Sequence, residues 1–444
     1  MTSACQRSTF APQAGDAMRI FAVTLIITLA ADALGPKTIH LGTGDLTFLP
    51  LLWALLAGAV FSLASPRLPS SIAISKQGQR TAAKLLQPGL LLFITTLGLL
   101  VGSSLQTVFK AGWALLFQEF GHFLGTMVFG LPIALLLGIK REAIGATFSV
   151  GREPSLAIIG ERFGMNSPEG RGVLAEYLTG TIFGAVFIAL FAGWLTSTGW
   201  FSPYALAMGS GIGSGTMMAA ASGAIAAHVP PAIAANVATY AAASNLITTT
   251  VGTYFTLLVS LPVTIKAYSL LEPILGRGRE SKGSMVSDED VEHDDGKPLS
   301  TLWTIICWFA LAAMAFIGHW LGAGSSVSSS TIVGLLIIMA ISAAGLGLSK
   351  LSRDRIPAIL FCSLLAMLST SPYFPASSNV KSITGSIDFL WLVPPILAFA
   401  GLSIGKDMPA FRRLGWRIVL VSLCANAGTF LGASLIAQFF THAS

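Results

Sequence analysis

The chain contains 444 residues, of which 53% are hydrophobic and 10% are charged, and its mean hydropathy is +0.75. Soluble domains usually carry about 25% charged residues, so this composition excludes a soluble enzyme, a fibrous protein, a disulfide scaffold and a disordered chain. The net charge of +6 (26 basic minus 20 acidic residues) comes from basic residues in a few loops, which form no nucleic-acid-binding stripe. The composition predicts an all-α polytopic membrane protein.

Apolar segments recur along nearly the whole chain, and a run of about 18 apolar residues with few charges is long enough to cross a bilayer. The first run is followed by further runs, which favours a membrane span over a cleaved signal peptide. The predicted spans are 18–34, 45–64, 88–106, 114–139, 172–197, 238–265, 301–322, 328–349, 356–371, 387–405 and 418–440. Two further apolar segments, 143–165 and 205–227, are interrupted, so we expect about 11–13 transmembrane helices.

The basic loops indicate the topology. Lys and Arg cluster in residues 65–87, 350–355 and 406–417, whereas the connections between these clusters carry little charge. Under the positive-inside rule the three clusters are cytoplasmic, the N-terminus lies with them, and the C-terminus is on the far side. We therefore expect a multi-pass protein of the bacterial cytoplasmic (inner) membrane.

A polar stretch over residues 276–298 is expected on the cytoplasmic side. Its acidic run could bind cations or a regulator, although a solvated, disordered interdomain loop explains the same composition. This stretch divides the chain into an N-terminal cytoplasmic tail (1–17), a larger membrane bundle (18–270), a charged linker (271–300) and a smaller C-terminal bundle (301–444).

A pattern of seven residues recurs 303 positions later without a gap. Chance would give about two or three identities over this length, so the pattern indicates a repeat. The positive-inside rule predicts that span 88–106 runs outward and span 387–405 runs inward. The two copies are therefore expected to be inverted, as in secondary transporters. Small-residue packing faces that converged independently would give a similar pattern. The residues are Gly98, Leu99, Gly102, Gly112, Trp113, Gly125 and Thr126, matched by Gly401, Leu402, Gly405, Gly415, Trp416, Gly428 and Thr429.

A weaker repeat relates the two interrupted segments at an offset of about 62 residues. Residues 149–155 (SVGREPS) precede a span containing Tyr177, and residues 210–216 (SGIGSGT) precede a span containing Tyr240. If both segments cross the membrane fully, the two units are parallel; if both are re-entrant hairpins, they enter from opposite sides. The uncharged turn 198–204 favours a periplasmic position and hence opposed hairpins.

The two interruptions are the predicted binding elements, because exposed backbone groups are tolerated in a membrane only where they line a cavity or are buried in protein. Half-helix N-termini favour an anionic ligand, and Arg152 is the natural partner of a carboxylate. Mutual neutralisation of Arg152 and Glu153, or an interfacial position for both, would explain the charged pair without a ligand. The predicted substrate-binding residues are Ser149, Gly151, Arg152, Glu153, Ser155, Ser210, Gly211, Gly213, Ser214, Gly215, Thr216 and Asn236.

Three ionisable residues within predicted spans are candidates for carrying a coupling ion. Glu119 and His122 share a helix face at positions i and i+3, and Glu176 follows the first interruption. Snorkelling near the interface and hydrogen bonding between helices would explain them equally. Asn236 and Asn245, after the second interruption, could ligate a substrate or an ion, or could hold helices together.

The runs SVGREPSLAIIGERFG, FIALFAGWL and ALAMGSGIGSGTMMAAASGAIAA resemble the LrgB-type membrane proteins, whose module the plastidal glycolate/glycerate translocator shares. The preceding run LLLFITTLGLLVGSSLQTVFKAGW resembles a span of the sodium/glutamate symporters. Together the resemblances cover about residues 88–260. Gly151, Arg152 and Glu153 replace the threonines of the LrgB pattern, and the second break lacks its histidine, so substrate identity does not transfer. The whole chain looks closest to a bacterial membrane family of unknown function.

These features favour a secondary active transporter that moves a small organic anion (a carboxylate), coupled to protons or sodium, by alternating access around two opposed broken helices. A non-transporting, holin-like or LrgB-like regulator is the alternative. No HExxH, GxSxG, paired-aspartate or Walker A motif appears, and the four scattered cysteines have no metal-ligand spacing, so we expect neither an enzyme nor a bound metal. No cofactor is expected apart from H⁺ or Na⁺ as coupling ion. The expected partners are the lipid bilayer and the anion, with a homodimer left open and no nucleic acid.

Overall fold

The structure is a computed structural model that describes residues 10–41, 44–70, 72–110, 112–164, 167–211, 214–276, 299–323, 329–353, 356–412 and 415–442. The elements before the linker are α1 (Ala14–Leu34), β1 (Lys37–Leu41), β2 (Gly44–Phe48), α2 (Pro50–Ala64), η1 (Ser65–Arg67), α3 (Lys76–Ser103), α4 (Leu105–Lys110), α5 (Gly112–Leu136), α6 (Glu142–Thr147), α7 (Arg152–Phe163), α8 (Pro168–Thr179), η2 (Gly180–Gly184), α9 (Ala185–Thr198), α10 (Pro203–Gly209), α11 (Gly215–Ala227), α12 (Pro231–Ile247), η3 (Thr248–Gly252), α13 (Thr253–Phe255), η4 (Thr256–Ser260) and α14 (Leu261–Leu275). Those after the linker are α15 (Thr301–Ala323), α16 (Ser329–Leu351), α17 (Ala358–Thr370), α18 (Ser377–Thr384), η6 (Phe389–Leu392), α19 (Val393–Phe411) and α20 (Trp416–His442).

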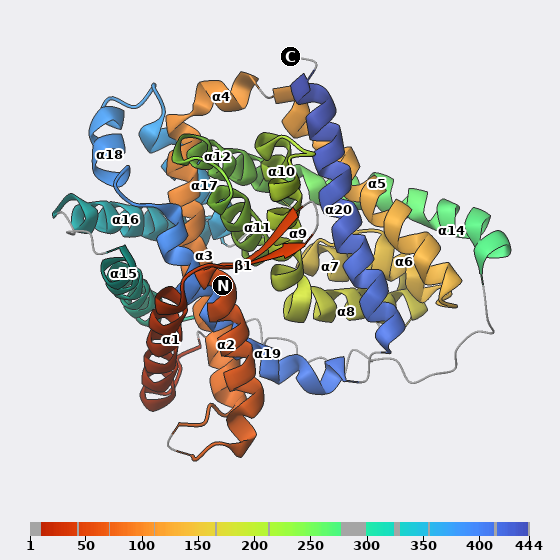
Figure 1. Ribbon diagram of the computed structural model, residues 1–444, viewed down its shortest axis with the longest axis horizontal. Helices are drawn as coiled ribbons and strands as arrows, with labels where there is room; N and C mark the ends of the chain where they lie inside the picture. The colour runs from red at the N-terminus through yellow and green to blue at the C-terminus, as the bar shows by residue number, and fades with distance from the viewer. Residues whose placement is uncertain are drawn as a thin grey trace, which may run out of the picture.

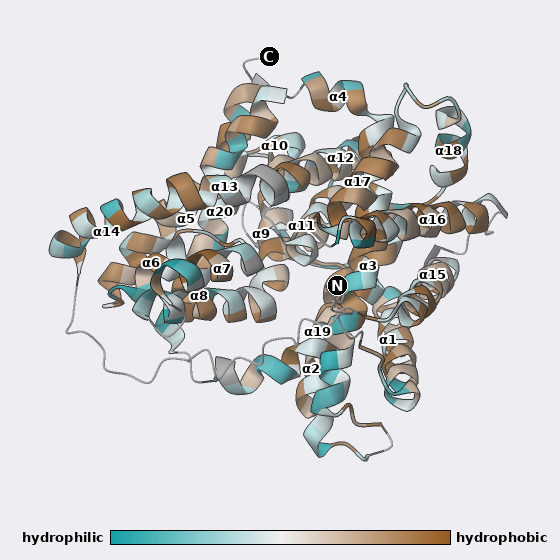
Figure 2. Ribbon diagram, turned by 180° about the vertical axis from the view of Figure 1, so that it is seen from behind, coloured by the Kyte–Doolittle hydropathy of each residue, from teal (hydrophilic) through white to brown (hydrophobic). Residues whose placement is uncertain are grey.

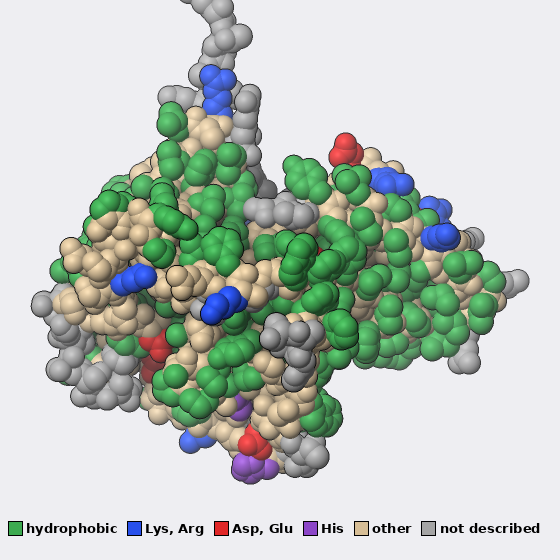
Figure 3. Space-filling model, turned by 90° about the horizontal axis from the view of Figure 1, so that it is seen from above, with side chains coloured by type: hydrophobic (Ala, Val, Ile, Leu, Met, Phe, Trp, Pro, Cys, Tyr) green, Lys and Arg blue, Asp and Glu red, His purple; other side chains and the backbone are tan. Residues whose placement is uncertain are grey.

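Long apolar helices build the molecule (Figure 1). Within the described residues, ten helices are long and apolar enough to cross a membrane, and α11 and α17 are shorter apolar helices. Figure 2 shows that hydrophobic residues extend along most of the long helices, and Figure 3 shows broad hydrophobic areas on the surface. Val60 and Leu258, for example, are 66% and 70% exposed. Helices in a bilayer face lipid with such side chains, so the predicted class, an all-α polytopic membrane protein, is confirmed.

A two-stranded sheet joins α1 to α2. Its strands pair antiparallel from Lys37–Phe48 to Leu41–Gly44. The span predicted over 45–64 therefore begins too early: the chain is extended as far as Phe48, and α2 begins at Pro50, in the first helical turn, where the missing proline N–H is not needed.

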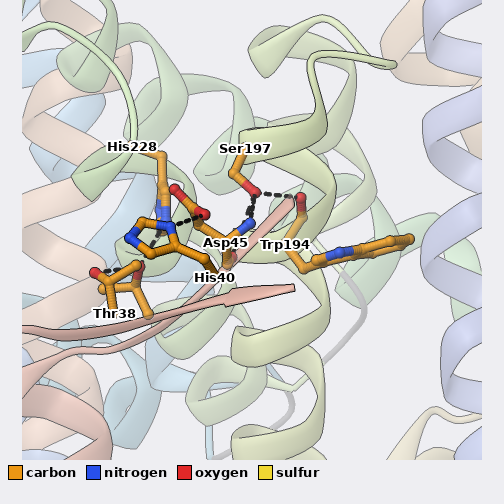
Figure 4. A network of polar contacts seen from close by, with 7 residues as sticks. Thr38, His40, Asp45, Trp194, Ser197 and His228 are labelled. Atoms are coloured by element: carbon orange, nitrogen blue, oxygen red, sulfur yellow. Dashed lines mark hydrogen bonds and ion pairs between the residues drawn. The ribbon is translucent and has the colours of Figure 1, made fainter. Parts of the chain in front are cut away.

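The sheet is anchored on the ends of two helices (Figure 4). The Asp45 N–H donates to Ser197 Oγ of α9 (2.6 Å), and Thr47 Oγ1 lies 3.0 Å from Nε2 of His228, which directly follows α11. The connection between α1 and α2 is thereby fixed to the C-terminal ends of α9 and α11.

Helix α20, the last helix of the chain, packs antiparallel along α5. The Phe117 ring of α5 stacks on the Phe440 ring of α20, with centroids 5.0 Å apart. Further along α5, Gly130 lies against Ala425 of α20. Because the residue numbers rise along one helix as they fall along the other, the two helices run in opposite directions.

The α5–α20 crossing joins residues that are 303 positions apart in the sequence. The Thr126 and Thr429 hydroxyls are hydrogen-bonded. A Cβ atom at Gly125 would lie 2.0 Å from the carbonyl oxygen of Gly428, and one at Gly428 would lie 2.2 Å from that of Gly125. Any side chain at either position would force the helices apart, so glycine at both positions is what permits this approach.

Two other helix pairs connect the halves on either side of the linker. Gly401 of α19 packs on Gly58 of α2, and Gly98 of α3 packs on Ala366 of α17. One hydrophobic core includes residues from both halves. The helices after the linker therefore do not form the separate smaller bundle predicted for residues 301–444; they complete the bundle begun by the first half.

The interrupted segment 143–165 forms a hairpin of α6 and α7. Glu142, the first residue of α6, pairs with Arg171 of α8 at 3.1 Å. The end of α7 is joined to the start of α8 by residues 164–167 alone. A continuous crossing would separate the two ends of the segment by about 30 Å, more than this short connection can span. Both ends therefore lie at the start of α8, and the break at 148–151 is the hairpin tip.

The segment 205–227 forms a second hairpin, of α10 and α11. Residues 199–202 join the end of α9 to the start of α10. At the other end of the hairpin, the His228 ring lies against Gly193 of α9, where a Cβ atom would be 3.2 Å from the imidazole Cε1. Both ends of this segment therefore lie at the C-terminal end of α9, and the break at 210–214 is the tip.

The two hairpins open in opposite directions. Helices α8, η2 and α9 form one continuous span of 31 residues, Pro168–Thr198. At 1.5 Å per residue this helix is about 46 Å long. The first hairpin opens at its N-terminal end and the second at its C-terminal end, so the expected arrangement of opposed hairpins is confirmed.

Candidate functional site

A cavity of about 280 Å³ lies between the tip of the first hairpin and helices α5, α17 and α20. The π-helical turn η3, which follows α12, forms another wall. The cavity is large enough for a small organic molecule and lies just below the usual range of pockets for drug-sized ligands. Its polar lining consists of seven hydroxyl groups and one imidazole, from Thr126, Ser149, Ser155, Thr248, Thr249, Thr256, Thr429 and His122.

Three predicted substrate-binding residues, Ser149, Gly151 and Ser155, line this cavity. The Gly151 N–H donates to Ser149 Oγ (3.0 Å), and Gly151 is the N-cap residue of α7, which has no side-chain cap. Ser155 is 1% exposed, and its hydroxyl has no hydrogen-bond partner among the described residues. The positive end of the α7 helix dipole makes this corner of the cavity favourable for an anion.

The side chains of Arg152 and Glu153 lie outside the described residues, as does Gly213. Arg152 is the first residue of α7, and it directly follows Gly151, which lines the cavity. A contribution of the Arg152 guanidinium to anion binding therefore stays a prediction.

One face of α5 carries three polar residues, two of which line the cavity. Glu119, His122 and Thr126 are spaced at i, i+3 and i+7, which places them on the same side of the helix. His122 lines the cavity and is 2% exposed, and within the described chain neither ring nitrogen has a hydrogen-bond partner. An imidazole with two unused nitrogens can donate to a ligand in the cavity.

Glu119 lies behind the cavity wall. Its Oε1 accepts hydrogen bonds from Gln118 Nε2 (2.8 Å) and from the hydroxyl of Thr248, which itself lines the cavity. Its Oε2 lies beside Gly252 of η3, where a Cβ atom would be 3.3 Å away. A single threonine hydroxyl thus separates the buried carboxylate from the cavity.

Glu176, the third predicted coupling residue, lies elsewhere. It is 2% exposed, and Asn426 Nδ2 of α20 donates to its Oε1 over 3.4 Å. The π-helical turn η2 begins four residues later, and a Cβ atom at Gly180 would lie 3.4 Å from Glu176 Oε1. The structure brings Glu119 and His122 together on one helix face, and it places Glu176 on a different helix pair.

None of the described residues of the second interruption lines the cavity. A Cβ atom at Gly211 would lie 2.2 Å from Ser244 Oγ of α12, so this tip packs tightly against that helix. The other predicted residues of this group are Ser210, Ser214, Gly215 and Thr216, which lie at the tip or at the start of α11, and the half-buried Asn236, which lies in the first turns of α12.

Sequence reasoning missed the residues of η3. Thr248 and Thr249 line the cavity together with Gly252, and Thr256 follows one turn later. The run Thr248-Thr249-Thr250 is the available signal, because adjacent polar residues in the middle of a long apolar segment are unusual. A π-helical turn inserts an extra residue into a helix and often occurs at functional sites.

Among the described residues, no three His, Cys, Asp or Glu side chains come close enough to hold a metal ion. Cys307 and Cys362 are buried, and Cys424 is half-buried. The polar groups at the cavity are hydroxyls, an imidazole and a nearby carboxylate, which suit the binding of a small polar ligand.

The fold and the cavity define a class: an all-helical, multi-pass membrane protein with two opposed hairpins, one of which places its tip at a cavity that carries polar groups. The chain belongs to DUF3100, a family described as "Protein of unknown function", whose model matches residues 29–270. The matched region contains α5, both hairpins and η3. A search of the curated proteins finds no match.

Proposed function

We propose that this protein is a secondary active transporter that moves a small organic anion, a carboxylate, across the cytoplasmic membrane. The observation that carries the proposal is the cavity at the tip of the first hairpin. There the start of α7, which has no side-chain cap, the unpartnered Ser155 hydroxyl and the unpartnered His122 ring all meet one cavity. Donors without partners around a space of this size are what a small carboxylate needs for its oxygens.

Alternating access around two opposed broken helices is supported by the symmetry of the contacts. Two copies related by a twofold axis in the membrane plane would meet, antiparallel, at equivalent residues. Helices α5 and α20 run antiparallel, and Thr126 and Thr429, 303 positions apart, are bonded at their crossing. These contacts favour an inverted repeat over independent convergence of small residues, because convergence does not require equivalent residues to touch.

Coupling to protons or sodium would operate through α5. Glu119 accepts a hydrogen bond from the hydroxyl of Thr248, and Thr248 lines the cavity. A change of charge at Glu119 would therefore alter a group that contacts a ligand in the cavity. A buried ionisable residue at membrane depth is costly and is retained where it has a function. Glu176 is a second candidate, on the helix that separates the two hairpins.

Contacts among three segments of the chain support a cytoplasmic N-terminus. The Ser300 N–H donates to the Phe10 carbonyl (2.9 Å), and Arg19 donates to the carbonyl of Ala73 (2.9 Å). The N-terminal segment, the basic loop 65–87 and the start of α15 thus occupy one end of the bundle. The positive-inside rule makes this end cytoplasmic and places the sheet β1–β2 on the far side.

A relation to the LrgB-type proteins and the sodium/glutamate symporters would fit this function. Like those families, as the sequence resemblance implies, the chain places helix breaks near a candidate ligand site. The proposed activity is transport, with no catalytic step. A non-transporting regulator is the competing function, and it would need no anion in the cavity.

The test is the thermal stability of the purified protein in detergent against glycolate, lactate, glutamate and dicarboxylates, with and without sodium. A ligand at a hundred times its dissociation constant stabilises the folded state by about 2.7 kcal/mol. Ser155→Ala and Arg152→Ala should weaken the response. Ser222→Ala is the matched control, because that buried serine of α11 bonds the Met218 carbonyl of its own helix, away from the cavity. A folded protein that responds to none of these acids would refute the carboxylate transporter and favour the regulator.

A further inference from the structure

Two adjacent buried residues of α5 each have an oxygen atom without a hydrogen-bond donor among the described residues. Gln118 is 0% exposed and Glu119 is 4% exposed. Their facing atoms bond to each other, Gln118 Nε2 to Glu119 Oε1 at 2.8 Å, whereas Gln118 Oε1 and Glu119 Oε2 have no partner in the part of the chain that the structure describes. Rotating the amide by 180° would turn its oxygen toward the carboxylate, so this contact fixes its orientation.

A third oxygen, the hydroxyl of Thr248, lies beside this pair. The single hydroxyl hydrogen of Thr248 has two acceptors, Glu119 Oε1 and the Ser244 carbonyl (3.0 Å), and the lone pairs of the hydroxyl stay available. The backbone of η3 passes Glu119 Oε2 at Gly252, where a Cβ atom would lie 3.3 Å from that oxygen. Glycine leaves room on that side of the carboxylate.

The charge at this position needs a partner. Among the described residues, no Lys, Arg or His forms an ion pair with Glu119, and a lone carboxylate within the membrane bundle is costly. Protonation would remove the charge but would leave the Gln118 oxygen unsatisfied. A water molecule could donate to both oxygens but would leave the charge. A small cation both compensates the charge and satisfies the two oxygens.

The ligand set indicates a monovalent ion. Calcium and magnesium take six or more oxygen ligands and are usually held by several carboxylates or by retained water. Here a single carboxylate acts with an amide oxygen and a hydroxyl, all hard oxygen donors. One negative charge in an enclosed site balances one positive charge.

We propose that Gln118, Glu119 and Thr248 bind a sodium ion. The inference deepens the proposed transport function, because it selects sodium over protons as the coupling ion. Since Thr248 also lines the cavity, an ion bound to its hydroxyl fixes the position of η3 and thereby the wall that contacts the anion. Sodium binding then prepares the cavity for its ligand.

The experiment measures sodium binding to the purified full chain in detergent, without any carboxylate. The melting temperature is followed from 0 to about 300 mM NaCl, with KCl keeping the ionic strength constant. Binding of ²²Na⁺ is measured in parallel over about the same concentration range. We expect saturable stabilisation by Na⁺ over K⁺. Glu119→Gln should abolish it, and Gln118→Leu should raise the half-saturating Na⁺ concentration about tenfold, as loss of one good oxygen ligand implies.

Gln79→Leu is the matched control. Gln79 is also a buried glutamine with an unpartnered Oε1, but its amide nitrogen donates to the Ser62 carbonyl and not to a carboxylate. This variant should keep the wild-type sodium response. If Glu119→Gln fails to fold, Gln118→Leu and direct ²²Na⁺ binding still test the site.

Three results would overturn the proposal: no sodium-selective effect in the folded wild type, an unchanged effect in Glu119→Gln, or equal effects of the Gln118→Leu and Gln79→Leu substitutions. Because no organic acid is present, failure here leaves the anion cavity untouched. Conversely, sodium binding without any response to acids would support this site and refute the carboxylate transporter.

Discussion

The close approach of helices α5 and α20 offers a sharp test of the packing of the protein. At the α5–α20 crossing, a Cβ atom at Gly125 would lie 2.0 Å from the Gly428 carbonyl oxygen. Real Cβ atoms essentially never come within 3.0 Å of another heavy atom, so Gly125→Ala requires the helices to separate by about 1 Å. A gap of that size forfeits a quarter to a half of each affected van der Waals contact.

Two effects of Gly125→Ala oppose each other. Alanine favours the helix by up to about 1 kcal/mol relative to glycine, whereas overpacking of a tight interface costs about 1–3 kcal/mol. The clash is with backbone, which cannot rotate away, so we expect the upper end of that range and a net loss of about 2 kcal/mol. For a chain of this size the melting temperature should fall by about 2 °C.

The assay is thermal unfolding of the purified protein in detergent, followed by intrinsic fluorescence. Gly347→Ala is the control, because Gly347 lies within α16 and a Cβ atom there would meet nothing within 4 Å. The control should leave the melting temperature unchanged or raise it slightly. If Gly125→Ala is as stable as the control, the helices do not approach as closely as described and the reasoning fails.

Three other predictions follow from the same contacts. Thr126→Val and Thr429→Val should each lower the free energy of unfolding by about 1 kcal/mol. The double variant should lose less than the sum, because both substitutions remove the same hydrogen bond. Additive losses in thermal unfolding would contradict this bond. Gly145→Val should separate α6 from α8, since even a Cβ atom would lie 1.9 Å from the Glu169 carbonyl oxygen. The melting temperature should therefore fall, and the response to carboxylates should disappear. A wild-type response would show that the first hairpin does not build the site. In a cysteine-free background, a membrane-impermeant maleimide should label Trp200→Cys in intact cells and Arg162→Cys only after permeabilisation, and equal labelling of both would contradict opposed hairpins.

The sequence predicted the spans and the hairpins well because both depend on local patterns. Hydropathy needs only a window of neighbouring residues, and most predicted spans coincide with a helix within a few residues at each end. The breaks at 148–151 and 210–214 were visible as glycines within apolar runs. The sheet β1–β2 was missed because its short strands adjoin the apolar run of α2, where Phe48 and Leu49 read as part of a span.

The packing between the halves could not be predicted, because it depends on which distant surfaces meet. The 303-residue repeat identified Gly125 and Gly428 as equivalent, yet equivalence does not require contact. The cavity was predicted in part: Ser149, Gly151 and Ser155 came from the break in the helix. Thr248 was missed because a π-helical turn changes which residues of a helix face inward, and the sequence pattern does not reveal where that turn occurs.

The contact between α5 and α20 also sets the order in which the protein can be completed. The residues that bond at the crossing are separated by 303 positions. At a synthesis rate of about 5–20 residues per second, α5 waits about 15–60 s in the membrane before its partner emerges. During that interval the glycine surface of α5 has only lipid or other chains to pack against. Helix α20 therefore completes this contact only after its synthesis, and α5 must remain correctly inserted, and unassociated with other chains, until α20 arrives.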